Sequence, residues 1–187
     1  MRHTFHSEQW LPYPVDVVFA FFANPENLPR LMPAWQKTRI EEATFAPPPP
    51  HPESSPTSHT GIVAGAGTKL KISFRPFPYS PVRVLWNAEI SEFLWNDHFC
   101  DQQLSGPFAY WHHCHRVLPQ TRTHDSVAPN FGTLLHDEVE YELPFGRLGD
   151  ITGRIITHQL HKTFAYRHNR TLELLMPHPS LEQPFQQ

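Results

Sequence analysis

The sequence lacks the features of a membrane-spanning, secreted or nucleotide-binding chain. No apolar run approaches the roughly 20 residues that span a bilayer, and Met1–Trp10 contains no apolar signal-peptide core. Gly61, Gly65 and Gly67 match neither a phosphate-binding loop nor a dinucleotide fingerprint, and there is no Gly-x-Ser-x-Gly elbow. These absences argue against nucleotide-dependent enzymes and serine hydrolases, and they predict a cytoplasmic protein.

Charge and cysteine are also scarce. The 15 Lys and Arg residues nearly balance 18 Asp and Glu, so the net charge of −3 gives no reason to expect nucleic acid as a partner. Two cysteines, Cys100 and Cys114, are too few for a disulfide scaffold, and we expect a reduced chain. Histidine is abundant, with 14 residues whose exposed members would become charged in mild acid.

The length of 187 residues suits one domain with a well-buried core. We predict a single domain at residues 1–176, with a Pro-rich loop at 46–61 and a flexible tail at 177–187. The prolines of the loop remove backbone donors and favour extended geometry. We favour a hairpin insertion here, and the alternative is a Pro-rich segment that binds a partner protein.

Hydrophobic periodicity predicts the order of the elements. A first strand at His3–Leu11 precedes two short helices, at Val15–Phe22 and around residues 24–32, where Asn24 is the expected N-cap. Further strands are expected at Trp35–Phe45, Thr68–Phe74, Val82–Phe93, His98–Leu104, Ala109–Leu118 and Thr133–Leu143, with a polar loop at Pro119–Gly132 and a long helix at Gly149–Leu175. This order predicts an α+β fold in which a curved antiparallel sheet of about six or seven strands wraps around the C-terminal helix. The space between sheet and helix is the expected ligand site.

The hairpin from residue 99 to residue 115 carries the most informative pattern. Alternate side chains of a strand point to opposite faces, so Trp111, His113 and His115 share one face. If Gln103 faces Trp111, then Asp101 opposes His113 and Phe99 opposes His115. Asp101 would then raise the pKa of His113 as in a general acid–base pair, or simply satisfy a buried imidazole, and we favour the structural role.

The same register places Cys100 opposite Cys114, but cross-strand geometry and a reducing compartment argue against a disulfide. His112 and Cys114 point away from the face of His113 and His115. The strand period therefore gives no set of three zinc ligands, and we expect neither a metal nor a cofactor.

Three segments resemble a known superfamily. The first, WLPYPVDVVFAFFANPENL at residues 10–28, is similar to the strand–helix–helix entry of the helix-grip (START-like, SRPBCC) superfamily, which includes START lipid-transfer domains, the birch-pollen-allergen fold and polyketide cyclase/dehydrases. Residues 99–115 and the segment GTLLHDEVEYELPFGRLG at 132–149 are similar to a bacterial branch described as ligand-binding. The resemblance covers nearly the whole chain and implies a helix-grip fold.

We therefore expect a non-enzymatic module that binds or transports a small hydrophobic ligand, such as a lipid, an isoprenoid or a polyketide-like molecule. The predicted apolar contacts are Trp86, Trp111, Tyr141, Ile155 and Phe164, and the predicted polar contacts are Asp101, His113, His115 and Asp137. Asp137 stands on an otherwise apolar face, where it would either anchor a ligand or pair with a buried His or Arg.

Two other functions are considered. A cyclase/dehydratase-type enzyme would use His113 and Asp101 to move protons on a bound carbonyl compound. An interaction protein would use the Pro-rich loop. The last helix also carries basic residues, for which we favour a solvated face over transient contact with an anionic membrane: Arg147, Arg154, Lys162, Arg167 and Arg170.

Overall fold

The computed structural model describes residues 1–52, 61–122, 130–144 and 149–176. Its strands are β1 (Arg2–Leu11), β2 (Arg39–Thr44), β3 (Lys69–Phe74), β4 (Val84–Leu94), β5 (His98–Ser105), β6 (Tyr110–Arg122) and β7 (Asn130–Glu142). Its helices are α1 (Val15–Phe22), α2 (Leu28–Leu31) and α3 (Gly149–Leu175), with short 3₁₀ turns η1 (Pro25–Asn27) and η2 (Ala34–Gln36).

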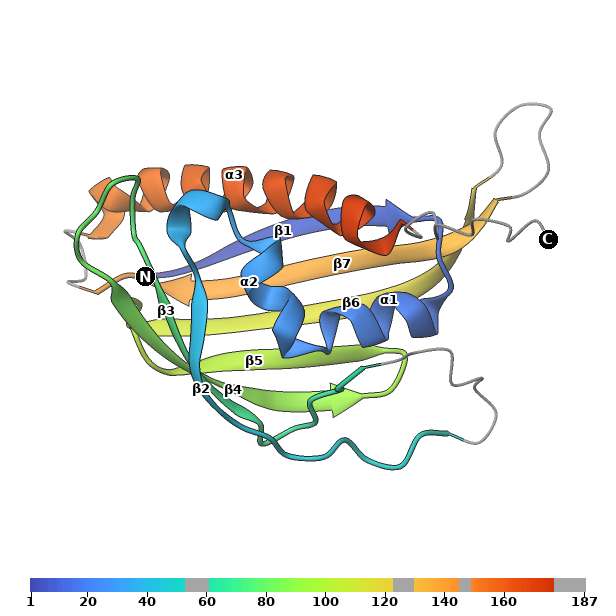
Figure 1. Cartoon of the computed structure of the whole chain (residues 1–187). Coiled ribbons are helices and arrows are strands. Elements are labelled where there is room, and N and C mark those ends of the chain that lie inside the picture. Colours follow the sequence, from blue (N-terminus) through green and yellow to red (C-terminus); the bar gives the residue numbers. More distant parts are fainter. Residues whose placement is uncertain (53–60, 123–129, 145–148, 177–187) are drawn as a thin grey trace, which may run out of the picture.

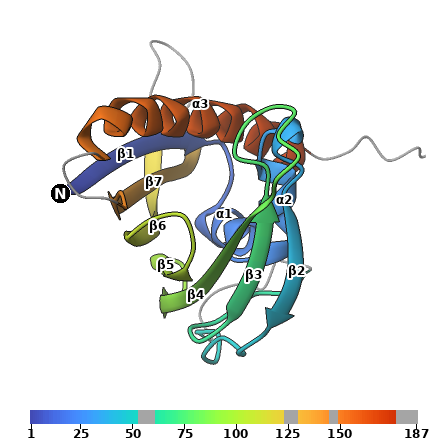
Figure 2. The ribbon, with the colours of Figure 1, turned by 90° about the vertical axis from the view of Figure 1, so that its left-hand side faces the viewer.

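The seven strands form one antiparallel sheet in the order β1-β7-β6-β5-β4-β3-β2. The sheet is open and strongly curved, and α3 lies across its concave side above β1 and β7 (Figure 1). Seen from the end, the strands turn from β1 beneath α3 round to β3 and β2, with α1 and α2 inside the curve (Figure 2). This arrangement confirms the predicted helix-grip fold.

The first helix is positioned by its apolar face. α1 begins directly after Pro14, whose fixed φ of −58° suits the residue before a helix. Val18 and Phe19 are buried and pack with Leu11 and Leu135 in one core cluster. In the next turn, the Asn24 side chain accepts a hydrogen bond from the Glu26 N–H at 3.0 Å, which confirms the predicted cap.

Two predicted boundaries are wrong. The segment from Trp35 does not start as a strand, because η2 ends at Lys37 in a left-handed conformation with φ of 49°, and β2 begins only at Arg39. Half of the predicted loop at Pro119–Gly132 belongs to strands, since β6 extends to Arg122 and β7 starts at Asn130. These strand ends are mostly polar and exposed, so they lack the alternation that identified the other strands.

The two ends of the Pro-rich loop are held against the sheet, and residues 53–60 lie outside the described residues. The indole of Trp95 donates a hydrogen bond to the Pro49 carbonyl at 2.7 Å. Gly65 packs so closely on Pro47 that a Cβ would lie 2.5 Å from its carbonyl oxygen, which makes glycine necessary there. The binding of a partner protein by this loop stays a prediction, as does the flexible tail at 177–187.

Cys100 and Cys114 form a disulfide, so the expectation of unpaired cysteines is wrong for this structure. The register places the two residues directly opposite each other on β5 and β6, with their Cα atoms 4.1 Å apart. Directly opposed residues in an antiparallel pair point to the same face, and the closer of the two pair types brings Cα atoms to about 4.5 Å.

Within the described residues, no helix is long and apolar enough to cross a membrane.

A candidate ligand-binding cavity

A cavity of about 350 Å³ lies between the concave face of the sheet and α3. Strands β3 to β6 form its floor, α3 forms its roof, and α1 with the turns that follow it forms one side. Most of the lining is aliphatic or aromatic: Phe22, Leu28, Leu31, Met32, Leu70, Ile72, Phe74, Val84, Trp86, Ala88, Ile90, Phe99, Phe108, Trp111, Ile156, Leu160 and Phe164.

Six of the sequence-predicted site residues line this cavity: Trp86, Asp101, Trp111, His113, His115 and Phe164. The Trp86 and Trp111 rings meet edge to face with centroids 4.8 Å apart, and Phe108 lies 4.8 Å from Trp111. Aromatic pairs in such arrangements stabilise the packing of this wall by about 0.5–1.5 kcal/mol each, beyond the effect of the area that they bury.

Three predicted residues do not line the cavity. Tyr141 is buried within the core, where its hydroxyl lies 2.9 Å from the Thr157 hydroxyl. Asp137 lies behind the two histidines and is 2% exposed. Ile155 is 66% exposed, and its neighbour Ile156 contributes to the lining instead. A helix turns by about 100° per residue, so an error of one position moves a side chain well away from the cavity.

The polar end of the cavity is built by strand register. His113 and His115 are two residues apart on β6 and share its inner face. Asp101 on β5 pairs with His113, and Asp137 on β7 pairs with His115. The predicted opposition of Asp101 to His113 is therefore confirmed, and Asp137 adds a second carboxylate from the other side.

A single oxygen of Asp137 contacts both imidazoles. His113 Nε2 donates a hydrogen bond to Asp137 Oδ1 at 3.0 Å, and His113 Nδ1 lies 3.5 Å from Asp101 Oδ1. His115 Nδ1 lies 2.6 Å from the same Asp137 oxygen, but its direction is unsuitable for a hydrogen bond, so the contact is electrostatic. Of the two alternatives for Asp137, pairing with a buried His is the one that the contacts show.

The two histidines differ in charge. Burial alone would lower the pKa of His113, but Asp101 and Asp137 outweigh burial and raise it. Burial and the adjacent positive charge of His113 lower the pKa of His115 to about 4. Burial would raise the pKa values of both carboxyl groups, but the histidines hold them lowered. The raised pKa favours a charged His113 between the two carboxylates, whereas His115 is neutral at pH 7.

Arg167 is a site residue that the sequence analysis missed. It was assigned to a solvated face of the last helix, but its side chain is 8% exposed and lines the cavity. Its guanidinium carbon lies 4.8 Å from the centroid of the Phe164 ring. The sequence contains one indication of this position. Arg167 follows Phe164 by three positions, so the two residues share one face of the helix.

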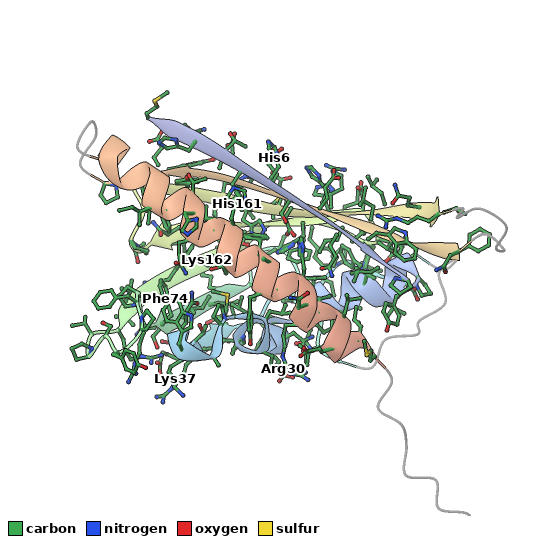
Figure 3. The ribbon with its side chains drawn as sticks, turned by 90° about the horizontal axis from the view of Figure 1, so that it is seen from above. His6, Arg30, Lys37, Phe74, His161 and Lys162 are labelled. Carbon is green, nitrogen blue, oxygen red and sulfur yellow. A yellow bond between two sulfur atoms is a disulfide. The ribbon has the colours of Figure 1, made fainter. Side chains whose placement is uncertain are left out.

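The outer face of α3 keeps other basic residues. Lys162 is exposed there and projects from the helix toward the viewer's side in Figure 3. Arg170 is paired with Glu173. Arg147 and the side chain of Arg154 lie outside the described part of the chain. Contact of this face with an anionic membrane stays a prediction. Arg167 would not take part in that contact, because it lines the cavity.

Several polar atoms in the lining are buried without a hydrogen-bond partner in the described structure. They are Gln36 Oε1, Thr38 Oγ1 and Trp86 Nε1. Burying such atoms unpaired costs about 1–3 kcal/mol each, so native structures usually satisfy them with protein, water or ligand. The side chains of these residues belong to the cavity lining, but the three atoms themselves are buried and not exposed to the cavity.

The cluster also contains a possible set of metal ligands, because one donor atom from each of Asp101, His113 and His115 lies within 4.8 Å of the others. The strand period alone did not reveal this set, since the third member comes from the neighbouring strand. A cation bound here would displace the proton held between His113 and the carboxylates. It would also be repelled by Arg167, which acts electrostatically on His115 and Asp137.

Comparisons with known proteins agree with the fold. A family model described as "Polyketide cyclase / dehydrase and lipid transport" matches residues 11–167. Norcoclaurine synthase from Thalictrum flavum, in complex with dopamine and hydroxybenzaldehyde, is similar in structure at 16% identity, with a TM-score of 0.58 over 95% of this chain and 90% of that chain.

Two further structures show the same fold. Protein TTHA0849 from Thermus thermophilus matches at 15% identity with a TM-score of 0.59, covering 92% of this chain and 99% of that chain. Major latex-like protein 151 from Panax ginseng matches at 12% identity with a TM-score of 0.57, covering 94% and 99%. Among curated protein sequences, none matches this chain.

Proposed function

The chain belongs to the polyketide cyclase/dehydrase and lipid transport family, and from this premise we propose that it binds a small ligand with an apolar body in the cavity beneath α3. The observation that carries the proposal is the cavity itself. Protein interiors are close-packed, with few voids larger than a water molecule. A space of about 350 Å³ with an aromatic and aliphatic lining falls instead in the range of small-molecule sites.

The polar atoms in the lining support a ligand that is amphipathic rather than purely hydrocarbon. Asp101 and Arg167 are charged residues of the lining, and His115 adds a neutral imidazole. A lipid, isoprenoid or polyketide-like molecule with oxygen substituents would satisfy these groups while its carbon skeleton fills the apolar space.

The test is mass spectrometry of small molecules extracted from protein purified under native conditions. Ala88→Phe should empty the site, because Ala88 is buried in β4 and lines the cavity, so a phenyl ring there would occupy ligand space. Leu85→Phe is the matched control, since Leu85 is exposed on the same strand. Equal extracts from wild type and Ala88→Phe would refute binding in this cavity.

A second candidate function is proton transfer on a bound carbonyl compound, and the state of His115 favours it. The sequence analysis assigned the base role to His113, but a general base must be neutral, and Asp101 and Asp137 raise the pKa of His113, which favours its charged form. His115 is neutral at pH 7 and lies beside the Asp137 carboxylate. If the protein is an enzyme, we infer that His115 is the base.

Deuterium exchange tests this role directly. Acetophenone in heavy water should lose its methyl proton signals in the presence of the protein, because a base that reaches the methyl carbon removes a proton, exchanges it with solvent and returns a deuteron to the enolate carbon. His115→Gln should slow the exchange by about 100-fold or more. An exchange rate equal to that in buffer would leave the protein as a binding module without this chemistry.

A further inference from the structure

We propose that the ligand of this cavity carries a carboxylate group and that Arg167 is the residue that binds it. The inference rests on the proposed binding function and specifies the chemical class of its ligand. Arg167 belongs to α3 and lines the cavity, as His113 and His115 do.

The burial of Arg167 lacks a structural explanation within the protein. Its side chain is 8% exposed, yet none of the described residues forms a hydrogen bond or ion pair with its guanidinium. The direct contact that the described residues offer it is the cation–π interaction with Phe164. Arg, Lys, Asp and Glu are almost never fully buried unless they are paired, and a guanidinium has five N–H donors to satisfy.

Asp137 does not fill this need. Its Oδ1 oxygen already contacts the imidazoles of His113 and His115 at 3.0 and 2.6 Å, and it lies behind them, away from the cavity. Arg167 and Asp137 influence each other electrostatically without approaching within ion-pair distance in the described structure. Asp101, the other carboxylate at this end, is paired with His113.

The groups around Arg167 carry no excess of negative charge that would repel an anion. The charges of His113 and Arg167 balance those of Asp101 and Asp137, and His115 is neutral. A carboxylate entering beside Arg167 would meet the cation directly, with the neutral His115 as a neighbour that can donate or accept a proton. The planar guanidinium fork matches the two oxygens of a carboxylate, which favours this group over a hydroxyl or a carbonyl.

Paired ligands that differ only in the head group test the inference. Calorimetric titration with decanoate and with decanol at neutral pH compares an acid and an alcohol with the same carbon chain. We expect wild-type protein to bind decanoate about 10- to 100-fold more tightly, the usual range for a hydrogen bond to a charged group. Arg167→Gln should reduce this preference to near one, and Arg167→Lys should keep part of it, because the lysine retains the charge without the fork.

Arg170→Gln is the matched control, since Arg170 is partly exposed on the same helix, does not line the cavity and pairs with Glu173. It should keep the wild-type preference. Equal binding of decanoate and decanol by wild type would overturn the carboxylate inference and leave the cavity function standing. A preference that survives in Arg167→Gln would assign the anion to another residue. Binding of neither ligand, together with equal native extracts from wild type and Ala88→Phe, would overturn both proposals.

Discussion

Acidification should destabilise this fold through His115, at pH values where few carboxyl groups have yet been protonated. The pKa of His115 is lowered from its ordinary 6.5 to about 4, because it is buried and lies beside the charged His113. In the unfolded chain, His115 binds a proton as the pH falls below about 6.5, whereas the folded protein excludes that proton until the pH nears 4. The unfolded state therefore gains protons first, and stability is lost as the pH falls through this window.

The size of the effect follows from the two pKa values. With 6.5 in the unfolded and about 4 in the folded state, the free energy of unfolding falls by about 2 kcal/mol near pH 5 and by about 3 kcal/mol near pH 4. These are substantial losses for a domain whose total stability is typically about 5–15 kcal/mol. Asp137 adds a further loss only at lower pH, because its folded pKa lies well below 3.8.

Urea unfolding at a series of pH values measures the effect, with wild type compared with His115→Gln. The other titrating groups act in both proteins, so the relevant quantity is the difference between their free energies of unfolding. That difference should shrink by about 3 kcal/mol between pH values near 7 and near 4. His158→Gln, on an exposed face of α3, controls for the loss of an imidazole as such. A difference that stays constant with pH would refute a buried, neutral His115.

Three further predictions concern stability. The raised pKa of His113 stabilises the fold below about pH 6.5, and this contribution is lost as the pH rises through its folded pKa, so His113→Gln should flatten the alkaline side of the same urea series. Cys114→Ser should lower the free energy of urea unfolding by about 3 kcal/mol, because the disulfide closes a loop with a sequence separation of 14; equal stability under reducing and oxidising conditions would contradict this. Leu135→Ala, at a fully buried core position, should cost about 2–5 kcal/mol in the same assay, whereas Leu118→Ala, at an exposed position on β6, should cost much less.

The polar cluster could be predicted largely because strand geometry is regular. Side chains alternate strictly along a strand, and a short turn fixes which residues oppose one another across a hairpin. These two rules were enough to place Asp101 against His113 from the sequence. The pairing of His115 with Asp137 was not predictable in the same way, because the polar sequence from 119 to 132 is typical of one long loop and so conceals the register of β6 against β7.

The helix contribution was harder to predict. The buried face of an amphipathic helix can be predicted only where its apolar residues recur at regular spacing. The buried side of α3 also contains polar residues, namely Thr163, Arg167 and Thr171. Its true inward stripe contains Ile156 and Phe164. The sequence spacing predicts Ile155 as a lining residue instead, and it predicts Arg167 in solvent because charged residues are usually exposed. Functional residues are the usual exceptions to that rule.

The histidine pair shows how neighbouring residues of one type acquire different roles. Both imidazoles contact Asp137, but Asp101 reaches only His113, so the first proton is held there. The ring centroids of His113 and His115 are 4.1 Å apart, and a second positive charge at that distance would be strongly disfavoured. One strand face thus carries His113, whose raised pKa favours the charged form, beside a neutral His115, and Arg167 lines the same cavity. A site that only binds requires Arg167 and the apolar wall, whereas a site that transfers protons also requires His115, so the Gln variants of these two residues separate the two functions.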